Sequence, residues 1–136
     1  MIKDFWINLP VKDVVKAKEF YKNIGFTLNP RHENNTQVGS LMVGKKPIIV
    51  MLFPNEVFET FINYPISDTL KGNETLLSFE LESPKEVDEL AIKVMDAGGT
   101  LYSEPELVQG FMYGFGFIDL DGHRWNPTYM DWKKIK

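Results

Sequence analysis

A pattern of apolar and polar residues that occurs twice, about 70 positions apart, constrains the fold of this chain more than any other feature. Each copy begins with a segment that predicts a strand, followed by a residue suited to cap the start of a helix. Asp13 takes the capping place in the first copy and Ser83 in the second, and Leu9 corresponds to Phe79 in the same way. The repeat therefore predicts one supersecondary unit used twice.

The first copy predicts one strand, one helix and three further strands. Apolar residues recur at helical spacing between Val14 and Ile24, and Gly25 supplies a helix stop. The expected strands of this copy are residues 5–11, 26–28, 37–43 and 48–53.

The second copy predicts the same order of elements. Ser83-Pro-Lys-Glu86 is a capping box with proline at the first helical position. The helix it begins has an apolar face from Val87 to Met95 and ends at Gly98. The expected strands are residues 75–81, 100–102, 111–118 and 124–129, and a short helix at 56–62 and a loop at 64–73 separate the copies.

This order of elements predicts an α+β fold made of two βαβββ modules. The chain has 136 residues, which suits a single domain, 1–136. We expect the first module at about residues 1–54, a linker at about 55–73 and the second module at about 74–131. The copies share a pattern more than identical residues, so an ordinary ferredoxin-like α+β sandwich is the alternative.

Composition excludes several classes of function. The chain has no cysteine, which removes disulfides, thiolate catalysis and cysteine zinc sites. The net charge of −4 argues against nucleic-acid binding, which needs clustered Lys and Arg. We see no signal peptide, and no stretch approaches the ~18 apolar residues that cross a membrane. We therefore expect a cytoplasmic protein with neither nucleic-acid nor membrane partners.

Two segments resemble the vicinal-oxygen-chelate superfamily, the group of glyoxalases, bleomycin-resistance proteins and dioxygenases. The first is Asn8-Leu-Pro-Val-Lys-Asp13, which leads into a helix carrying Phe20-Tyr21 and ending at Ile24-Gly-Phe26. The second runs from Gly110 to Asn126 and contains an Asp-Leu-Asp-Gly-His turn. The similarity extends over essentially the whole chain and is strongest to bacterial members related to lactoylglutathione lyase.

The resemblance implies a definite architecture. Each module of the family curls its strands into a half-open barrel, and two modules form a cleft within one chain or across a dimer. In metal-using members a divalent ion in the cleft chelates two neighbouring oxygens of the substrate and acts as a Lewis acid. Members are commonly dimers, so we expect a homodimer, with apolar residues of segment 57–62 available to pack on a partner.

The metal-ligand positions of the family are not matched here. By the resemblance they fall on Trp6, on Leu76, on Asn126 and among residues 50–52, where the family usually has His, Gln or Glu. None of these is a normal ligand for a hard metal, although Asn offers a carbonyl oxygen. We therefore predict no metal site and no cofactor, with an off-pattern divalent metal as the alternative.

The side chains expected to line the cleft could bind a ligand without a metal. Strand parity places alternate side chains of the first, fifth and last strands on one side, which the resemblance identifies as the cleft. An aromatic and glycine-rich run, residues 110–117, could stack on a ligand or be ordinary strand core. The expected ligand-binding residues are Trp6, Asn8, Ser78, Tyr113, Phe115, Arg124 and Asn126.

Two residues are candidates for acid–base catalysis. Glu80 is a base with a raised pKa if its strand turns it inward, and simply exposed if the parity is off by one. His123 could act as a general base or a ligand, but a turn histidine that fixes a hairpin is the alternative.

These observations favour a metal-free protein whose cleft binds a small aromatic or amphipathic molecule. The first alternative is a glyoxalase-type lyase or isomerase, or a dioxygenase-related enzyme, that uses a divalent ion or the pair Glu80 and His123. The second alternative is a structural or regulatory dimer with a filled, inert interior.

Overall fold

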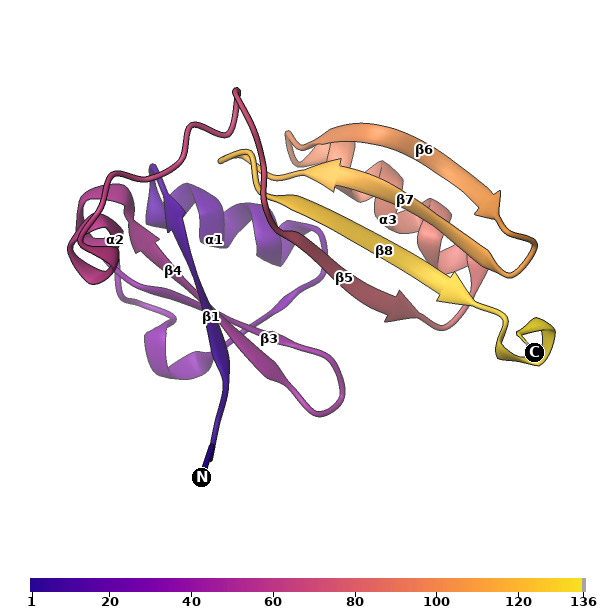
Figure 1. Ribbon diagram of the computed structural model, residues 1–136, viewed down its shortest axis with the longest axis horizontal. Coiled ribbons are helices and arrows are strands. Elements are labelled where there is room, and N and C mark those ends of the chain that lie inside the picture. The colour runs from indigo at the N-terminus through magenta and orange to yellow at the C-terminus, as the bar shows by residue number, and fades with distance from the viewer. Residues whose placement is uncertain (136) are drawn as a thin grey trace. The chain divides into compact units, whose positions relative to one another are not determined.

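The computed structural model describes residues 1–135 and contains two compact units, Met1–Asp68 and a second that begins at Thr69. Each unit has a four-stranded sheet with a helix packed against one face (Figure 1). Both units have the element order strand, helix, strand, strand, strand, which confirms the predicted α+β class. Neither sheet closes into a barrel.

The first unit follows the strand order β1-β4-β3-β2. β1 runs parallel to β4, and the other neighbours are antiparallel. Helix α2 follows β4 directly, and a 3-10 turn, Pro30–His32, follows β2. The elements are β1 (Trp6–Val11), α1 (Val14–Asn23), β2 (Thr27–Leu28), β3 (Gly39–Val43), β4 (Ile48–Pro54) and α2 (Asn55–Ile62).

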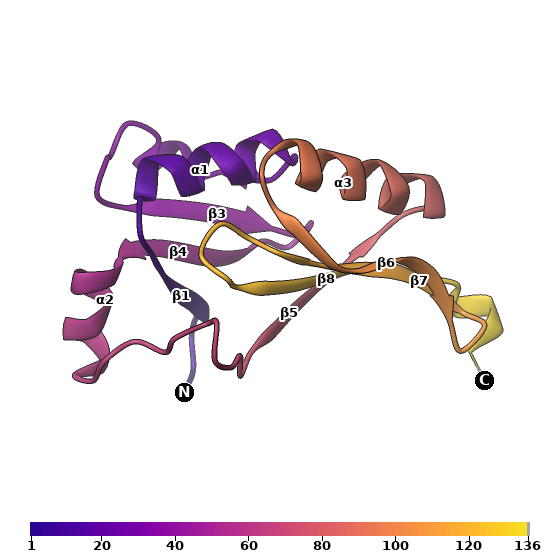
Figure 2. The ribbon, with the colours of Figure 1, turned by 90° about the horizontal axis from the view of Figure 1, so that it is seen from above.

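The second unit repeats this topology with the strand order β5-β8-β7-β6. β5 runs parallel to β8, and helix α3 covers one face of the sheet (Figure 2). A 3-10 turn, Trp132–Lys134, follows β8. The elements are β5 (Leu76–Leu81), α3 (Pro84–Asp96), β6 (Thr100–Val108), β7 (Met112–Ile118) and β8 (Arg124–Met130).

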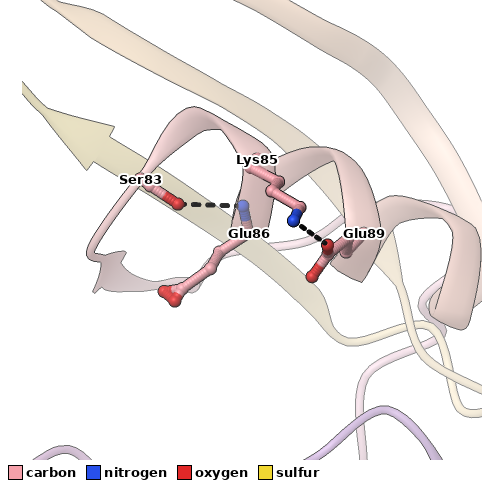
Figure 3. Close-up of polar contacts among 4 residues, drawn as sticks. All are labelled: Ser83, Lys85, Glu86 and Glu89. Carbon is pink, nitrogen blue, oxygen red and sulfur yellow. Dashed lines mark hydrogen bonds and ion pairs between the residues drawn. The ribbon is translucent and has the colours of Figure 1, made fainter.

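The helix caps confirm the two predicted starts. The Asp13 side chain accepts a hydrogen bond from the Lys16 amide at 3.0 Å, and Ser83 Oγ accepts one from the Glu86 amide at 3.2 Å. Figure 3 shows the second cap with the exposed ion pair Lys85–Glu89, whose atoms lie 3.8 Å apart. Glu86 Oε1 accepts from the Glu82 amide, one residue before the cap, so the reciprocal half of the capping box is shifted.

Each helix buries its apolar face against its own sheet. In the second unit the buried Trp125 ring stacks on Phe117 at 6.2 Å between centroids, and Phe79 meets the same indole edge-on at 5.9 Å. The core of the first unit includes Val11, Phe20, Tyr21, Leu41 and Leu52. The core of the second unit includes Val87, Val94, Phe115, Phe117 and Trp125.

Strand β6 differs most from the sequence prediction. It extends to Val108, whereas the sequence predicted a strand of residues 100–102. Pro105 obscured this length, because proline usually interrupts a strand. β6 is an edge strand with register shifts between Leu101 and Ser103 and between Ser103 and Glu106, where a proline is tolerated.

No helix within residues 1–135 has the length and apolar character needed to cross a membrane.

Candidate functional site

One face of the second sheet lies opposite helix α3, and we call it the open face. Side chains alternate along β5, so that Ser78 and Glu80 are exposed while their neighbours Leu77 and Phe79 are half-buried toward the core. The strand register then defines which residues of β8, β7 and β6 share the face. The open face includes Leu76, Ser78, Glu80, Ser103, Glu106, Gly114, Gly116, Arg124, Asn126 and Thr128.

A straight row of four residues crosses the open face. Glu80 pairs with Thr128, Thr128 with Gly114, and Gly114 with Glu106. A Cβ on Gly114 would lie 2.5 Å from Thr128 Cγ2, so the threonine methyl covers the glycine. The two middle residues of the row, Thr128 and Gly114, therefore form a shallow surface, which we call the floor. A carboxylate stands at each end of the row, on a different strand.

A hollow of about 150 Å³ lies on this floor. It is smaller than the ~300 Å³ of a full ligand pocket, so it can hold part of a small molecule while the rest lies on the open face. Its lining combines apolar side chains with hydroxyl, amide and carboxylate groups. The lining residues are Ser103, Glu106, Val108, Met112, Gly114, Phe115, Asn126 and Thr128.

Asn126 lines the hollow and also completes the sheet. Its Nδ2 donates a hydrogen bond to the carbonyl oxygen of Phe115 at 2.8 Å. The next residue of the strand, Pro127, has no N–H to offer strand β7. The Asn126 side chain thus supplies a hydrogen-bond donor to β7 at a point where the main chain of β8 has none. Its Oδ1 can accept a hydrogen bond from a ligand.

Tyr102 is a residue of this region that the sequence reasoning missed. A Cβ on Gly116 would overlap the Tyr102 ring, so the ring lies directly on the glycine. The Arg124 guanidinium stacks on the same ring, 4.8 Å from its centroid. Partial burial raises the pKa of Tyr102, and Arg124 opposes that shift. The glycine-rich run 110–117 was the available signal, because a strand glycine often marks a close approach.

Glu80 lies on the exposed side of its strand. Its Oε2 accepts a hydrogen bond from the indole Nε1 of Trp132 at 2.6 Å. The hypothesis that Glu80 is a general base assumed that its carboxylate points inward, away from water. In the structure the residue is exposed. The carboxylate instead anchors the C-terminal turn, which follows the end of β8 (Figure 1).

The structure does not bring His123 and Glu80 together. His123 is half-buried in the turn before β8, where its amide donates to Asp119 Oδ1 at 2.9 Å. Glu80 pairs with Thr128, which is five residues after His123. At the usual rise of a strand, His123 and Thr128 are about 16 Å apart. Such a separation does not allow the two side chains to share a proton directly.

Tyr113 and Phe115 lie on the helix side of the second sheet. The Tyr113 hydroxyl donates to Asp88 Oδ1 on α3 at 2.6 Å. Phe115 is 1% exposed and packs against Phe117. The side chains of both residues are therefore separated by the sheet from Ser78, the remaining polar candidate on β5.

The hydrogen bond to Asp88 raises the pKa of Tyr113, with smaller contributions from burial and from the Asp88 charge. Because the folded-state pKa is raised, the stability this group contributes is complete below pH ~10 and is lost as pH rises through the raised value. We expect Tyr113→Phe to show a shallower loss of stability than the wild type between pH ~9 and ~11, measured by urea unfolding. Identical pH dependence in the two proteins would contradict this assignment.

In the first unit the candidates Trp6 and Asn8 share the face of the sheet opposite α1. Trp6 is 55% exposed, and Asn8 pairs with Met51 of β4. Asn8 corresponds to Ser78, which pairs with Asn126 in the second unit. The repeat therefore identifies Met51, among residues 50–52, as the counterpart of Asn126.

The four positions that the family resemblance implies for a metal are thus Trp6, Met51, Leu76 and Asn126. They supply an indole, a thioether, an aliphatic side chain and a single amide oxygen, which is not a donor set for a divalent hard cation. Within residues 1–135 no group of three or more His, Asp or Glu side chains is arranged to hold a metal ion. These side chains do not fit a divalent cation.

Comparisons with known proteins agree with this fold. Residues 5–39 match the family model described as Bleomycin resistance protein-like N-terminal. The fold is that of the glyoxalase/bleomycin resistance/dioxygenase proteins. Among solved structures, hypothetical protein SA1046 from S. aureus is 36% identical, with a TM-score of 0.83 over 95% of this chain and 94% of that one.

More distant structures share the fold. A family enzyme from Burkholderia phytofirmans is 19% identical, with a TM-score of 0.77 over 92% of this chain and 96% of that one. The fosfomycin resistance protein FosX from Listeria monocytogenes, in a mutant form complexed with Mn(II) and 1S,2S-dihydroxypropylphosphonic acid, is 20% identical. Its TM-score is 0.68 over 98% of this chain and 94% of that one. No curated protein matches the chain.

Proposed function

We propose that this protein binds a small organic molecule on the open face of its second sheet without using a divalent metal. The observation that carries this proposal is the set of side chains at the four implied ligand positions, Trp6, Met51, Leu76 and Asn126. A family scaffold with these residues retains a surface for ligands and loses the donors for chelation.

The open face supports binding because its polar groups border a low apolar floor. Asn126 Oδ1 and the hydroxyl groups of Ser103 and Thr128 surround or line the hollow, next to Met112 and Val108. A few placed polar groups on an apolar floor are typical of ligand sites.

Charge favours a cationic ligand. Glu80 and Glu106 stand at the two ends of the row across the sheet, and the exposed Trp132 indole adjoins Glu80. Arg124, a basic residue of the open face, is stacked on Tyr102. A planar cation could therefore be attracted by the carboxylates and by the face of the indole.

This proposal predicts an order of binding among three aromatic probes. We expect benzamidinium to shift the NMR signals of Ser103, Asn126 and Thr128 more than indole does, and benzoate to shift them least. Ser103→Phe should fill the hollow and weaken benzamidinium binding roughly tenfold, about 1.4 kcal/mol.

Ser67→Phe is the matched control, because Ser67 is an exposed residue of the first unit that does not line the hollow, and the substitution adds the same ring. Equal shifts from all three probes, or equal weakening by both variants, would remove the open face as the site.

We further propose that the two units act as one domain and that the protein is a cytoplasmic homodimer. Phe61 is 58% exposed and Ile62 45% exposed on α2, and these two side chains are available for a partner copy. Light scattering that gives the mass of one chain at micromolar concentration would contradict the dimer.

A further inference from the structure

We propose that the loop after β2 forms a cation site made of main-chain carbonyl groups, which Lys18 fills with its own ammonium group. The Lys18 Nζ donates to the carbonyl oxygens of His32 at 2.7 Å, Glu33 at 3.0 Å and Asn35 at 2.8 Å. An ammonium group has three N–H donors, and each finds an acceptor here. The ligand class of the site is a primary ammonium ion.

The burial of Lys18 shows that this arrangement is built into the core of the first unit. The residue is 7% exposed, although lysine is among the residues least often buried. A Cβ on Gly39 would lie 3.0 Å from Lys18 Cγ, so the glycine of β3 leaves space for the lysine stem. Burial of a charge on this scale is costly unless it is paired with polar partners, and the three carbonyl groups supply them.

The loop needs the cation in order to keep its shape. Its own main-chain bonds are turn contacts, with the His32 amide on the Asn29 carbonyl at 3.1 Å and the Asn35 amide on the His32 carbonyl at 3.1 Å. Three carbonyl dipoles that converge on one point repel each other unless a positive charge lies between them. Lys18 therefore closes a loop that its local turns alone do not fix.

This closure has a consequence for the surface of the first unit. A hollow of about 740 Å³ lies between α1 and the loop, and Lys18 and the loop residues Glu33 and Asn35 form part of its wall. When the ammonium group is removed, the loop should lose its fixed conformation and the wall of this hollow should move.

Chemical rescue tests the site. In Lys18→Ala the lost side chain has the size of propylammonium, whereas Lys18→Met fills the same space without a donor. We expect the amides of residues 32–37 to exchange hydrogen at least roughly tenfold faster in both variants than in the wild type. Propylammonium chloride should restore slow exchange in Lys18→Ala only, and tetramethylammonium chloride at equal ionic strength should restore it in neither.

The proposal is overturned if both variants exchange like the wild type, or if propylammonium fails to restore Lys18→Ala. A measurement on the wild type covers the case in which the variants do not fold. In a ¹⁵N-lysine NMR spectrum, the Lys18 ammonium should give a signal that exchanges slowly with water. Lys22→Arg should retain that signal, because Lys22 is exposed on α1. Absence of any slowly exchanging ammonium signal in the wild type also overturns the proposal.

Discussion

Trp125→Ala is expected to lower the free energy of unfolding of the second unit by about 3–5 kcal/mol. The Trp125 side chain is 2% exposed, stacked on Phe117 and met edge-on by Phe79, so its removal leaves a cavity in the centre of the core. Urea unfolding followed by circular dichroism measures the loss.

Trp132→Ala is the matched control for this change. Trp132 is 61% exposed and its indole donates a hydrogen bond to Glu80, so we expect a loss of no more than about 1 kcal/mol. Losses of equal size in the two alanine variants would mean that Trp125 does not organise the core of this unit.

Gly116→Ala is expected to cost about 1–3 kcal/mol through overpacking. The new methyl group would occupy the place of the Tyr102 ring, whose Cζ overlaps the ideal Cβ position. The ring must then move, and its stacking on Arg124 is lost with it.

A double-mutant cycle tests this cause. In a Tyr102→Ala background the Gly116→Ala change should cost much less, because the ring that it displaces is gone. Gly72→Ala is the control, since a Cβ there meets no atom within 4 Å, and its effect should stay within about 0.5 kcal/mol. Additive effects of the Tyr102 and Gly116 changes would show that the ring does not fill the space above the glycine.

Most of the fold could be predicted because the signals that specify it are local. The caps at Asp13 and Ser83 and the periodic apolar residues predicted both helices, and the repeat predicted the order of elements along the chain. β6 was predicted too short, because Pro105 is unfavourable in most strands and acceptable only at an edge. Whether a strand lies at an edge is a property of the whole sheet, which local sequence does not reveal.

The candidate site was less predictable because it depends on contacts between distant residues. Strand parity predicted that Ser78 and Asn126 lie on one side of the sheet, and the register of β5 and β8 pairs the two residues. Along β7, Tyr113 and Phe115 lie on the helix side of the sheet and Gly114 lies on the open face. This assignment follows from the register of β7 with its neighbouring strands. The burial of Lys18 was missed for a similar reason, since its three partners lie 14 to 17 residues further along the chain.

Metal content is the most direct test of the central claim that this chain keeps the family scaffold and lacks the donors for chelation. The untagged protein would be dialysed against excess Mn(II), Ni(II), Zn(II) or Fe(II), desalted and analysed by mass spectrometry. FosX from Listeria monocytogenes, which has been solved with Mn(II), is the positive control. We predict that no metal is retained by this protein under conditions in which FosX retains it. Retention of about one ion per chain would contradict the account, because Trp6, Met51, Leu76 and Asn126 could not supply that site.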